Sequence, residues 1–349
     1  MVNDMAVKQV SPYFDISEEV LEHYRGKRIL VTGGAGAIGS NLVKALLAAE
    51  PERVIVIDDL SSGFKWLLPE DPRLIFVHGS VLDEEKLRYA FSFKPHIVFH
   101  LAAHFANQNS VEHPKTDLLV NGLGTLNVLQ YSHLAGVQRF VFASSGCSVY
   151  GSDAPLPFEE KMPPSLHLDT PYQIHKLLGE LYCNYFYEYY RLSVAIARYF
   201  NVYGPGEVPG RYRNVIPNFM WWALHKQPLP ITGTGEETRD FTYVGDIIDG
   251  TLRLGALEEA VGETFNLASN TETKIIDLAK MINEIAGNDA GVVFKPKREW
   301  DRSTRRRASI EKAKKMLGYQ PKTSIKTGLQ NVYSWFRENF GYIKTSARF

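Results

Sequence analysis

The sequence predicts an α/β fold, in which a doubly wound parallel sheet of the Rossmann type is followed by a smaller C-terminal α/β lobe. Three observations support this prediction. Short apolar runs alternate with helical stretches from Lys27 to about residue 200, which is the pattern of βαβ units. A glycine-rich turn, residues 33–39, follows the first run. After Asn201, glycine and proline residues interrupt the pattern and indicate a second lobe.

The individual elements follow from where apolar runs start and stop. Strands are expected at Arg28–Thr32, Arg53–Asp58, Leu74–His78, His96–His100, Phe140–Ala143 and Val194–Arg198. Helices are expected at Ser17–Tyr24, Ser40–Glu50, Glu84–Phe91, Lys115–Leu134 and Tyr172–Tyr190. In the second lobe, helices Ile216–His225, Asp246–Leu257 and Lys274–Ile285 alternate with extended segments Pro230–Thr232 and Thr264–Asn266. We therefore expect an N-terminal extension (1–26), the sheet domain (27–200) and the lobe (201–349), with the chain free to cross back between them.

Composition excludes several classes of protein. The 349 residues fit two domains or one large one, and 44% hydrophobic with 22% charged residues excludes a disordered or collagen-like chain. Because 39 basic residues balance 39 acidic ones, nucleic-acid binding is not favoured. Two cysteines, Cys147 and Cys183, exclude a disulfide scaffold and fit a reducing, cytoplasmic location. No run approaches the ~18 apolar residues of a membrane span, and residues 1–26 lack the apolar region of a signal peptide.

Gly33, Gly36 and Gly39 form a tight turn between a predicted strand and a predicted helix. Such a turn needs residues without a Cβ, and it lets backbone N–H groups approach a pyrophosphate at the helix N-terminus. Asp58 closes the next strand, where its carboxylate accepts hydrogen bonds from both ribose hydroxyls of NAD and repels the 2′-phosphate of NADP. The turn alone would also suit a structural role, but together with Asp58 it predicts bound NAD in residues 27–200.

Tyr172 and Lys176 lie at the start of the helix that follows Pro171. Their spacing places the phenol and the ammonium on one helix face. A free phenol has a pKa of ~10, and a nearby ammonium favours the phenolate, which makes the phenol a usable base. Such a pair is common on solvated helix faces. Here it follows a dinucleotide turn and the serines after Phe140–Ala143, at the strand end where a cofactor crevice opens, so it predicts a catalytic base.

Together these residues resemble the extended short-chain dehydrogenase/reductase family, in particular its nucleotide-sugar epimerases and dehydratases. The resemblance runs from about Lys27 into the C-terminal region. It is carried by Gly33-Gly34-Ala35-Gly36-Ala37-Ile38-Gly39, Asp58-Asp59-Leu60-Ser61-Ser62-Gly63, Leu101-Ala102-Ala103, Asn121 with Gly124-Thr125, Ser145, Tyr172, Lys176, Arg198-Tyr199-Phe200-Asn201-Val202-Tyr203-Gly204-Pro205 and Gly233-x-Gly235-x-x-x-Arg239-Asp240-Phe241. It implies NAD in the sheet domain and a nucleoside-diphosphate sugar, UDP-linked by the nearest resemblance, in the lobe.

The resemblance also implies site residues. Catalysis would use Ser145, Tyr172 and Lys176. The cofactor residues would be Gly33, Gly36, Ala37, Ile38, Gly39, Asp58, Asp59, Ser62, Gly63, Ser80, Val81, Leu101, Ala102, Ala103, Asn121, Tyr172, Lys176 and Tyr199. The substrate residues would be His104, Ser145, Gly146, Cys147, Ser148, Asn201, Asn214, Val215, Leu229, Ile231, Arg239, Arg298, Asp301 and Arg305. Arg239 and Arg298 would clamp the diphosphate, with Asp301 on the nucleotide ribose.

Two departures from the family pattern bear on these assignments. Gly79-Ser80 stands where relatives often carry an acid, which removes one expected hydrogen bond to adenine. The serine loop is one residue longer than in many relatives. Counting from the strand makes Ser145 the catalytic serine, whereas counting back from Val149 reaches Gly146, which has no hydroxyl. The strand count is preferred, because the loop resembles that of a subgroup of sugar 4-epimerases.

The reaction implied is 4-epimerisation through a transient 4-keto sugar. Related 4,6-dehydratases place Asp-Glu after the catalytic hydroxyl residue, and uronate decarboxylases place a Glu there. Here Gly146-Cys147-Ser148 follows, with no carboxylate. The dehydratase and the decarboxylase remain alternatives. A 3,5-epimerase using Cys147 is weaker, because those relatives carry the cysteine where Ser148 stands.

A protein that binds NAD without catalysis remains a further alternative, although the intact Ser145, Tyr172 and Lys176 argue against it. No metal is expected, since no carboxylate or cysteine spacing supports a site at His100, His104 and His175. The sugar stays open between a neutral hexose, an N-acetylhexosamine and a hexuronate. Residues 295–315 carry ten basic and three acidic residues, and part of this charge suits a diphosphate. The aromatic-rich helix Tyr172–Tyr190 is too apolar to be fully exposed, and the resemblance implies a homodimer in which this helix and Lys115–Leu134 pair with their counterparts.

Overall fold

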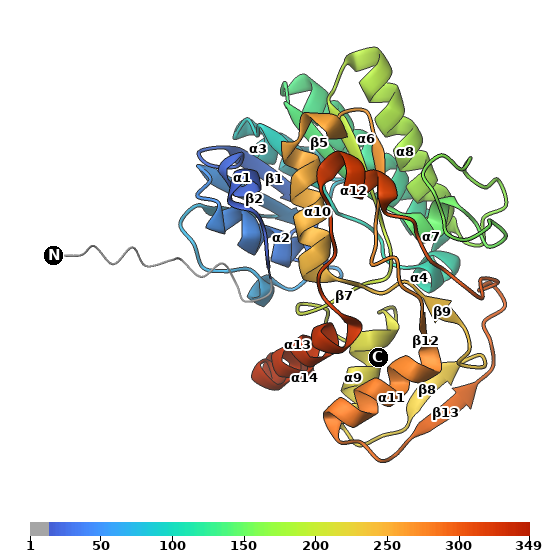
Figure 1. Cartoon of the computed structure of the whole chain (residues 1–349). Coiled ribbons are helices and arrows are strands. Elements are labelled where there is room, and N and C mark those ends of the chain that lie inside the picture. Colours follow the sequence, from blue (N-terminus) through green and yellow to red (C-terminus); the bar gives the residue numbers. More distant parts are fainter. Residues whose placement is uncertain (1–13) are drawn as a thin grey trace.

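A seven-stranded parallel sheet organises the structure (Figure 1), in the order β11-β6-β5-β4-β1-β2-β3. The computed structural model describes residues 14–349, apart from the side chains of Cys147 and Ser148. The strands are β1 (Arg28–Thr32), β2 (Arg53–Asp58), β3 (Leu74–His78), β4 (Ile97–His100), β5 (Arg139–Ser145), β6 (Val194–Tyr199) and β11 (Thr264–Leu267). All neighbouring pairs are parallel. The predicted doubly wound sheet is confirmed, and β11 extends it beyond β6.

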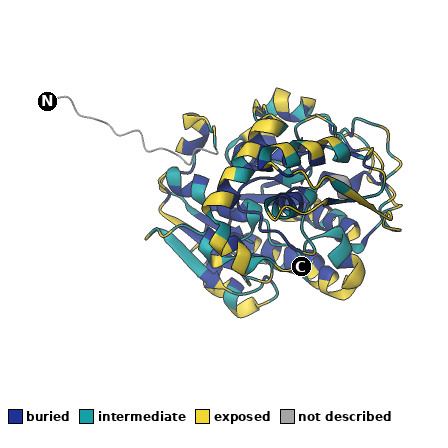
Figure 2. Ribbon diagram, turned by 90° about the horizontal axis from the view of Figure 1, so that it is seen from below, coloured by how far each residue is buried: buried dark blue, intermediate teal, exposed yellow. Residues whose placement is uncertain are grey.

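Helices cover both faces of the sheet because its strands are nearly continuous apolar runs that must be buried on each side. One face packs against α2 (Ala37–Ala48) and α10 (Val244–Ala256), and the other packs against α3 (Glu84–Ser92), α6 (Gly124–Leu134) and α8 (Pro171–Tyr190). Figure 2 shows the buried strands between helices whose outer surfaces are exposed. Two apolar clusters result, and the one beneath α2 and α10 continues into the lobe.

The segment predicted as one helix over Lys115–Leu134 is interrupted. It consists of α5 (Pro114–Asp117), a π-helical turn η2 (Leu118–Leu123) and α6. A π-turn holds one extra residue per turn, which a 3.6-residue hydrophobic period does not reveal. The short helices α4 (Asn107–Glu112) and α7 (Gly146–Val149) lie at the carboxyl ends of β4 and β5.

The lobe is built around β8 (Leu229–Thr232), which pairs with β13 (Val292–Lys295), and the helices α9 (Val215–Leu224) and α11 (Ile275–Ala286). Shorter elements complete the chain. These are α1 (Glu18–Glu22), η1 (Lys65–Leu67), β7 (Val202–Tyr203), β9 (Thr238–Arg239), β10 (Thr242–Tyr243), η3 (Glu258–Ala260), β12 (Thr273–Lys274), α12 (Glu311–Leu317), α13 (Ile325–Glu338) and α14 (Phe340–Ser346). Residues 1–13 of the expected N-terminal extension lie outside the described residues.

The chain crosses back from the lobe to the sheet. After β8, it returns to place α10 against α2 and β6, then adds β11 to the sheet edge beside β6. It leaves again to complete the lobe with α11 and β13. The sheet domain therefore includes residues well beyond 200. No helix within residues 14–349 combines the length and apolar character needed to cross a membrane.

Candidate active site

A cleft lies at the carboxyl ends of the strands, between the sheet and the lobe. It is lined by the turns after β1, β2 and β3, the segment after β4, the end of β5, the first turns of α8 and the segment after β6. All the predicted cofactor residues except Asn121 line it. Asn121 is buried just behind, where its side-chain oxygen accepts from the His104 backbone N–H at 2.9 Å.

The glycine turn leaves no room for side chains. A Cβ on Gly33, whose φ is +71°, would lie 2.7 Å from the Ala102 backbone nitrogen, and one on Gly39 would lie 2.2 Å from the Gly33 carbonyl oxygen. Gly36 is the N-cap of α2, and no side chain caps the helix there. The first N–H groups of α2 therefore point into the cleft without a side-chain acceptor, as an anion-binding helix N-terminus requires. This cradle fits a pyrophosphate.

Asp58 is held at the end of β2 in the orientation that a ribose would need. Its two carboxylate oxygens accept hydrogen bonds from the backbone N–H groups of Ala35, at 2.9 Å, and Leu60, at 2.8 Å. Burial raises the pKa of Asp58, and these two bonds only partly oppose it. Because a carboxylate oxygen accepts more than one hydrogen bond, both oxygens can still accept from ribose hydroxyls.

Tyr172 and Lys176 share the face of α8 that meets the cleft. Thr170 caps the helix and Pro171 occupies its first turn, so the start of α8 is fixed beside Tyr172. The Lys176 Nζ donates to the Ala143 carbonyl oxygen at 2.8 Å and lies 5.8 Å from the centre of the Tyr172 ring. Burial lowers the pKa of Lys176 to about 8, with Asp117 opposing the shift, so the ammonium is the major form at neutral pH.

Ser145, the last residue of β5, lines the same cleft as Tyr172 and Lys176. Gly146, which follows it, packs so closely on the Phe200 ring that a Cβ would come within 1.9 Å of it. The side chains of Cys147 and Ser148, both predicted to contact the substrate, lie outside the described residues. The structure therefore brings together the three predicted catalytic residues.

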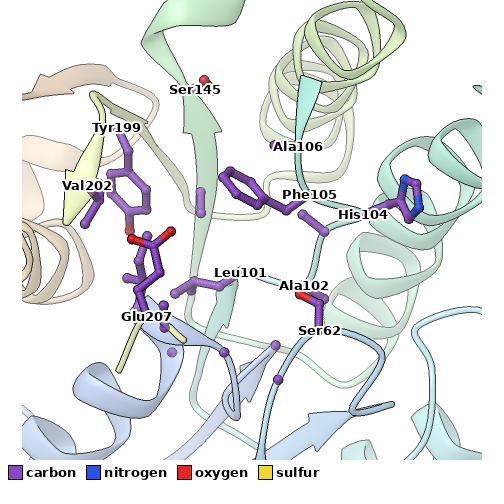
Figure 3. Close-up of a pocket in the computed structure, with 18 of the residues that line it drawn as sticks. Ser62, Leu101, Ala102, His104, Phe105, Ala106, Ser145, Tyr199, Val202 and Glu207 are labelled. Atoms are coloured by element: carbon purple, nitrogen blue, oxygen red, sulfur yellow. The ribbon is translucent and has the colours of Figure 1, made fainter. Parts of the chain in front are cut away.

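The segment after β4 contributes both Phe105 and the predicted His104 to the lining of the cleft, and the Phe105 ring is directed across it (Figure 3). The His104 ring points to the opposite side, with its Nδ1 3.5 Å from the Asp117 carboxylate. The Phe105 ring meets the Tyr172 ring edge-on, with 6.2 Å between ring centres. An aromatic wall beside the reacting groups was not predicted, because Phe105 belongs to no motif.

Asp117 connects this wall to α8. Its buried carboxylate accepts from Asn121 Nδ2 at 3.0 Å and hydrogen-bonds His175 Nδ1 at 2.5 Å. His175 stands between Tyr172 and Lys176 on α8. Burial alone would raise the pKa of Asp117, but hydrogen bonds from His104, His175 and Asn121 outweigh burial and lower it. The buried carboxylate therefore stabilises the fold in its charged form.

Replacing Asp117 with asparagine should lower the free energy of unfolding at pH 7 by about 1–3 kcal/mol, because one of the two acceptor oxygens becomes an NH2 donor that faces a donor partner. The pKa of Asp117 is lower in the folded than in the unfolded protein. The stabilisation is therefore fully present above pH ~3.9, the unfolded pKa, and is lost as the pH falls through the folded-state pKa. Urea unfolding at pH 7 and pH 3.5 should show the difference between the wild type and D117N narrowing in acid. An equal difference at both pH values would contradict this account. Glu236→Gln, in an exposed ion pair, is the control.

The predicted substrate residues divide into those that line the cleft, among them His104 and Ser145, and those that do not. Asn201 and Asn214 line the cleft, and Asn214 occupies the N-cap position of α9 without a capping bond from its side chain. Leu229 and Ile231 are fully buried in the lobe core. Val215, which begins α9, and Gly146 do not line the cleft.

The arginines are arranged differently from the prediction. Arg239 pairs with Asp301 at 3.1 Å, Arg305 forms an exposed two-bond pair with Glu272, and exposed Arg298 lies over the Trp300 ring. Neither these three arginines nor Asp301 line the cleft, whereas Arg213 and Arg306 do. The Oδ1 oxygen of Asp301 is buried without a hydrogen-bond partner and lies 4.0 Å from Arg306 Nη2, so the predicted bond from Asp301 to a ribose hydroxyl stays a prediction.

Glu207 is a further cleft residue that no motif indicated. It is buried, and its carboxylate accepts from Asn214 Nδ2 at 2.9 Å. Burial raises the pKa of Glu207 to about 7, against the opposing charge of Arg213. Gly206 beside it packs on Ala37 and Asn41 of α2, so Glu207 belongs to the phosphate end of the cleft. Figure 3 shows Ser145 near the top of the view and the Glu207 carboxylate below it, beside the end of the Tyr199 ring.

His100 and His175 do not form a metal site with His104. His100 is buried between the hydroxyls of Thr32 and Thr125, and burial lowers its pKa to about 3, which keeps it neutral. Among the residues that the structure describes, no three His, Cys, Asp or Glu side chains are grouped to hold a metal ion.

Comparison with known proteins agrees with these features of the fold and the cleft. The model of the NAD dependent epimerase/dehydratase family matches residues 29–268. A UDP-glucose 4-epimerase of Mycolicibacterium smegmatis is 35% identical over 313 residues, which cover 89% of this chain and 98% of that protein. A UDP-N-acetyl-alpha-D-glucosaminuronate decarboxylase of Bacillus cytotoxicus is 33% identical, and the match covers 89% of this chain and 98% of that protein.

Solved structures agree with this result. An epimerase from the methanogen Methanothermobacter thermautotrophicus superposes with a TM-score of 0.94 and is 54% identical, with 95% of this chain and 98% of that chain covered. The enzyme WbmF of Bordetella bronchiseptica, in complex with NAD+ and UDP, gives a TM-score of 0.82 at 35% identity, with 93% and 96% covered.

Proposed function

The chain belongs to the NAD-dependent epimerase/dehydratase family, and on this premise we propose that it inverts C4 of a UDP-linked sugar through a transient 4-keto intermediate. Its cofactor is NAD, and the open N-terminus of α2 and the Asp58 carboxylate fit the pyrophosphate and a ribose. We also propose a cytoplasmic location, which the buried free thiol of Cys183 suits.

In this proposal the chain's own residues handle the C4 proton. Tyr172 removes the proton of the C4 hydroxyl and later returns it, while Ser145 hydrogen-bonds that hydroxyl from the end of β5. The Lys176 ammonium, held on the Ala143 carbonyl, stabilises the phenolate. NAD supplies the acceptor and donor of the C4 hydride. Asn201 and Asn214, from the lobe side of the cleft, are proposed to bind the sugar diphosphate.

The observation that carries the proposal is the loop after Ser145. Elimination of the C6 hydroxyl requires removal of a C5 proton, and Gly146-Cys147-Ser148 supplies no carboxylate for that step. We assign no part of that step to Glu207, because its carboxylate accepts from Asn214 Nδ2 at 2.9 Å and the residue follows β6 rather than the serine loop. A 4-keto sugar that meets no such base can rotate within the site and accept the hydride on the opposite face of C4.

Product analysis tests this function. Purified protein would be incubated separately with UDP-glucose, UDP-N-acetylglucosamine and UDP-glucuronate, with no NAD added, and the products identified by proton NMR. We expect a C4 epimer from at least one of them. A 4-keto-6-deoxy sugar would instead identify a dehydratase, and a pentose would identify a decarboxylase, the activity named for one relative. Absence of turnover with all three would contradict the proposal.

We further propose that the protein is a homodimer. Exposed apolar side chains gather on η2 and α8, which pack against each other. They are Leu118, Leu119, Leu123, Ile174, Leu181 and Tyr185. A contiguous apolar surface of this kind usually marks an interface.

The double substitution Leu119→Glu with Leu181→Glu should convert the dimer to a monomer, because each charge would be buried twice across a two-fold interface. Sedimentation at micromolar concentration measures this directly. Tyr89→Glu, on the similarly exposed surface of α3, should leave the dimer intact. A monomeric wild type would overturn the proposal.

A further inference from the structure

Arg306 is a buried charged residue at the edge of the cleft. Only 7% of its surface is exposed, yet it lines the cleft together with Ser144, Ser145 and Tyr172. Removing a guanidinium from water costs several kcal/mol unless an anion and hydrogen-bond acceptors replace the water. The partners of Arg306 therefore indicate whether the protein itself satisfies this group.

Within the described residues, these partners satisfy only part of the guanidinium. Its Nε donates to the Ser303 hydroxyl at 3.0 Å. The nearest carboxylate oxygen is Oδ1 of Asp301, 4.0 Å from Nη2 and too far for a hydrogen bond. The other oxygen of Asp301 accepts from Arg239 at 3.1 Å. Ser303 therefore fixes the orientation of the fork, and the terminal N–H groups remain available for a ligand.

Neighbouring residues place Arg306 at the reacting end of the cleft. The Phe158 backbone N–H donates to the Arg307 carbonyl at 2.9 Å, and Phe158 forms an isolated bridge with Ala308. The Phe158 ring stacks on Tyr150, with ring centres 4.9 Å apart, directly after α7. Since α7 begins immediately after Ser145, the segment reaches the cleft from the Ser145 side.

The adjacent arginines differ from Arg306 in their surroundings. Arg305 is exposed and makes two hydrogen bonds to Glu272, at 2.9 and 2.6 Å. Arg307 does not line the cleft. Of this run of three, only Arg306 is directed to the site, and its charge is not balanced at hydrogen-bond distance by any described residue.

We propose that the substrate is a nucleoside-diphosphate hexuronate and that Arg306 binds its C5 carboxylate. The inference rests on the proposed function and names the substrate class of that site. A planar guanidinium binds a carboxylate through two parallel charge-assisted hydrogen bonds. The neutral C6 hydroxyl of a hexose cannot form such a pair, and it would leave Asp301, at 4.0 Å, as the nearest anion to Arg306. Arg306 is thus a specificity-determining residue.

The first test compares kcat/KM of the wild type for UDP-glucuronate and UDP-glucose. We expect a preference for the uronate of about 10²-fold or more, as for loss of one partner of a buried charge pair. Equal or better use of UDP-glucose would overturn the inference and leave 4-epimerisation standing. If the protein epimerises neither UDP-glucuronate nor UDP-glucose, nor the N-acetylated form of either sugar, both the proposed function and the inference are contradicted.

The second test is Arg306→Met. It should lower kcat/KM for UDP-glucuronate about 10²-fold and change that for UDP-glucose less than threefold. Calorimetric titration with UDP alone should give the same affinity in both proteins. An equal loss for both sugars with weaker UDP binding would assign Arg306 to the diphosphate and overturn the inference. Lys297→Met, an exposed cation of the same segment, is the matched control. If R306M does not fold, the wild-type preference still decides.

Discussion

Tyr172→Phe should lower kcat by about 10²–10⁴-fold, the contribution of a positioned acid–base group. The phenol is 8% exposed and lines the cleft with Ser145, while Lys176 is fixed beside it on the Ala143 carbonyl. Phenylalanine preserves the ring and its contact with Phe105. The loss should therefore appear in kcat, with NAD still bound and KM little changed.

The measurement is steady-state epimerisation together with the NAD content of the purified protein. Tyr189→Phe removes an exposed hydroxyl from the same helix and should behave as the wild type. A Tyr172→Phe protein that keeps more than a tenth of wild-type kcat would rule out Tyr172 as the base. Loss of NAD along with activity would instead show that the hydroxyl mainly supports cofactor binding.

Arg198→Met should cost about 3–5 kcal/mol of unfolding free energy, because it leaves a buried carboxylate without its cation. Arg198 on β6 binds both oxygens of Glu180 on α8, at 3.0 and 2.7 Å, and donates to the Tyr150 hydroxyl at 2.9 Å. Ser144, beside the catalytic serine, donates to the same carboxylate at 2.5 Å. Burial opposes the charged form, but the bonds to Glu180 and Tyr150 prevail and raise the pKa of Arg198.

Denaturant unfolding followed by circular dichroism measures this cost. Lys274→Met breaks an exposed pair with a 2.6 Å contact and should cost less than about 1 kcal/mol. If the two substitutions lower the free energy of unfolding equally, burial of the Arg198–Glu180 pair would not explain its contribution to stability. Because Ser144 depends on Glu180, we also expect Arg198→Met to lower kcat at temperatures where the protein is still folded.

Local pattern predicted the fold wherever one segment carries its own signal. β3 has the predicted bounds, Leu74–His78, because its apolar run is bounded by polar residues. α8 begins one residue before the predicted start because Pro171 occupies its first turn. Two features depend on distant partners and were not visible. The π-turn η2 breaks the expected helix, and β11 joins the sheet beside β6.

The residues of the site likewise divide into those that a local pattern predicted and those that depend on tertiary contacts. The glycine turn, Asp58 and the Tyr172–Lys176 pair were predicted because each function needs a fixed local spacing. Phe105, Glu207 and Arg306 reach the cleft from irregular segments whose path depends on tertiary contacts. The family resemblance predicted Arg305 as a substrate residue, but it is the next residue, Arg306, that is buried and lines the cleft, whereas Arg305 is exposed. Composition could not decide between them.

The return of β11 to the sheet has a consequence for the order of events at the ribosome. Until Leu267 has been synthesised, β6 is an open edge with unpaired N–H and C=O groups, and its neighbours lack the cover of α10 until Ala256 is made. A nascent chain that ends near residue 200 already carries the glycine turn and Tyr172, yet it exposes apolar surface that the later segments bury. Folding of the cofactor half must therefore wait for translation of most of the lobe, and a chain truncated between the two should need a chaperone rather than form a smaller stable domain.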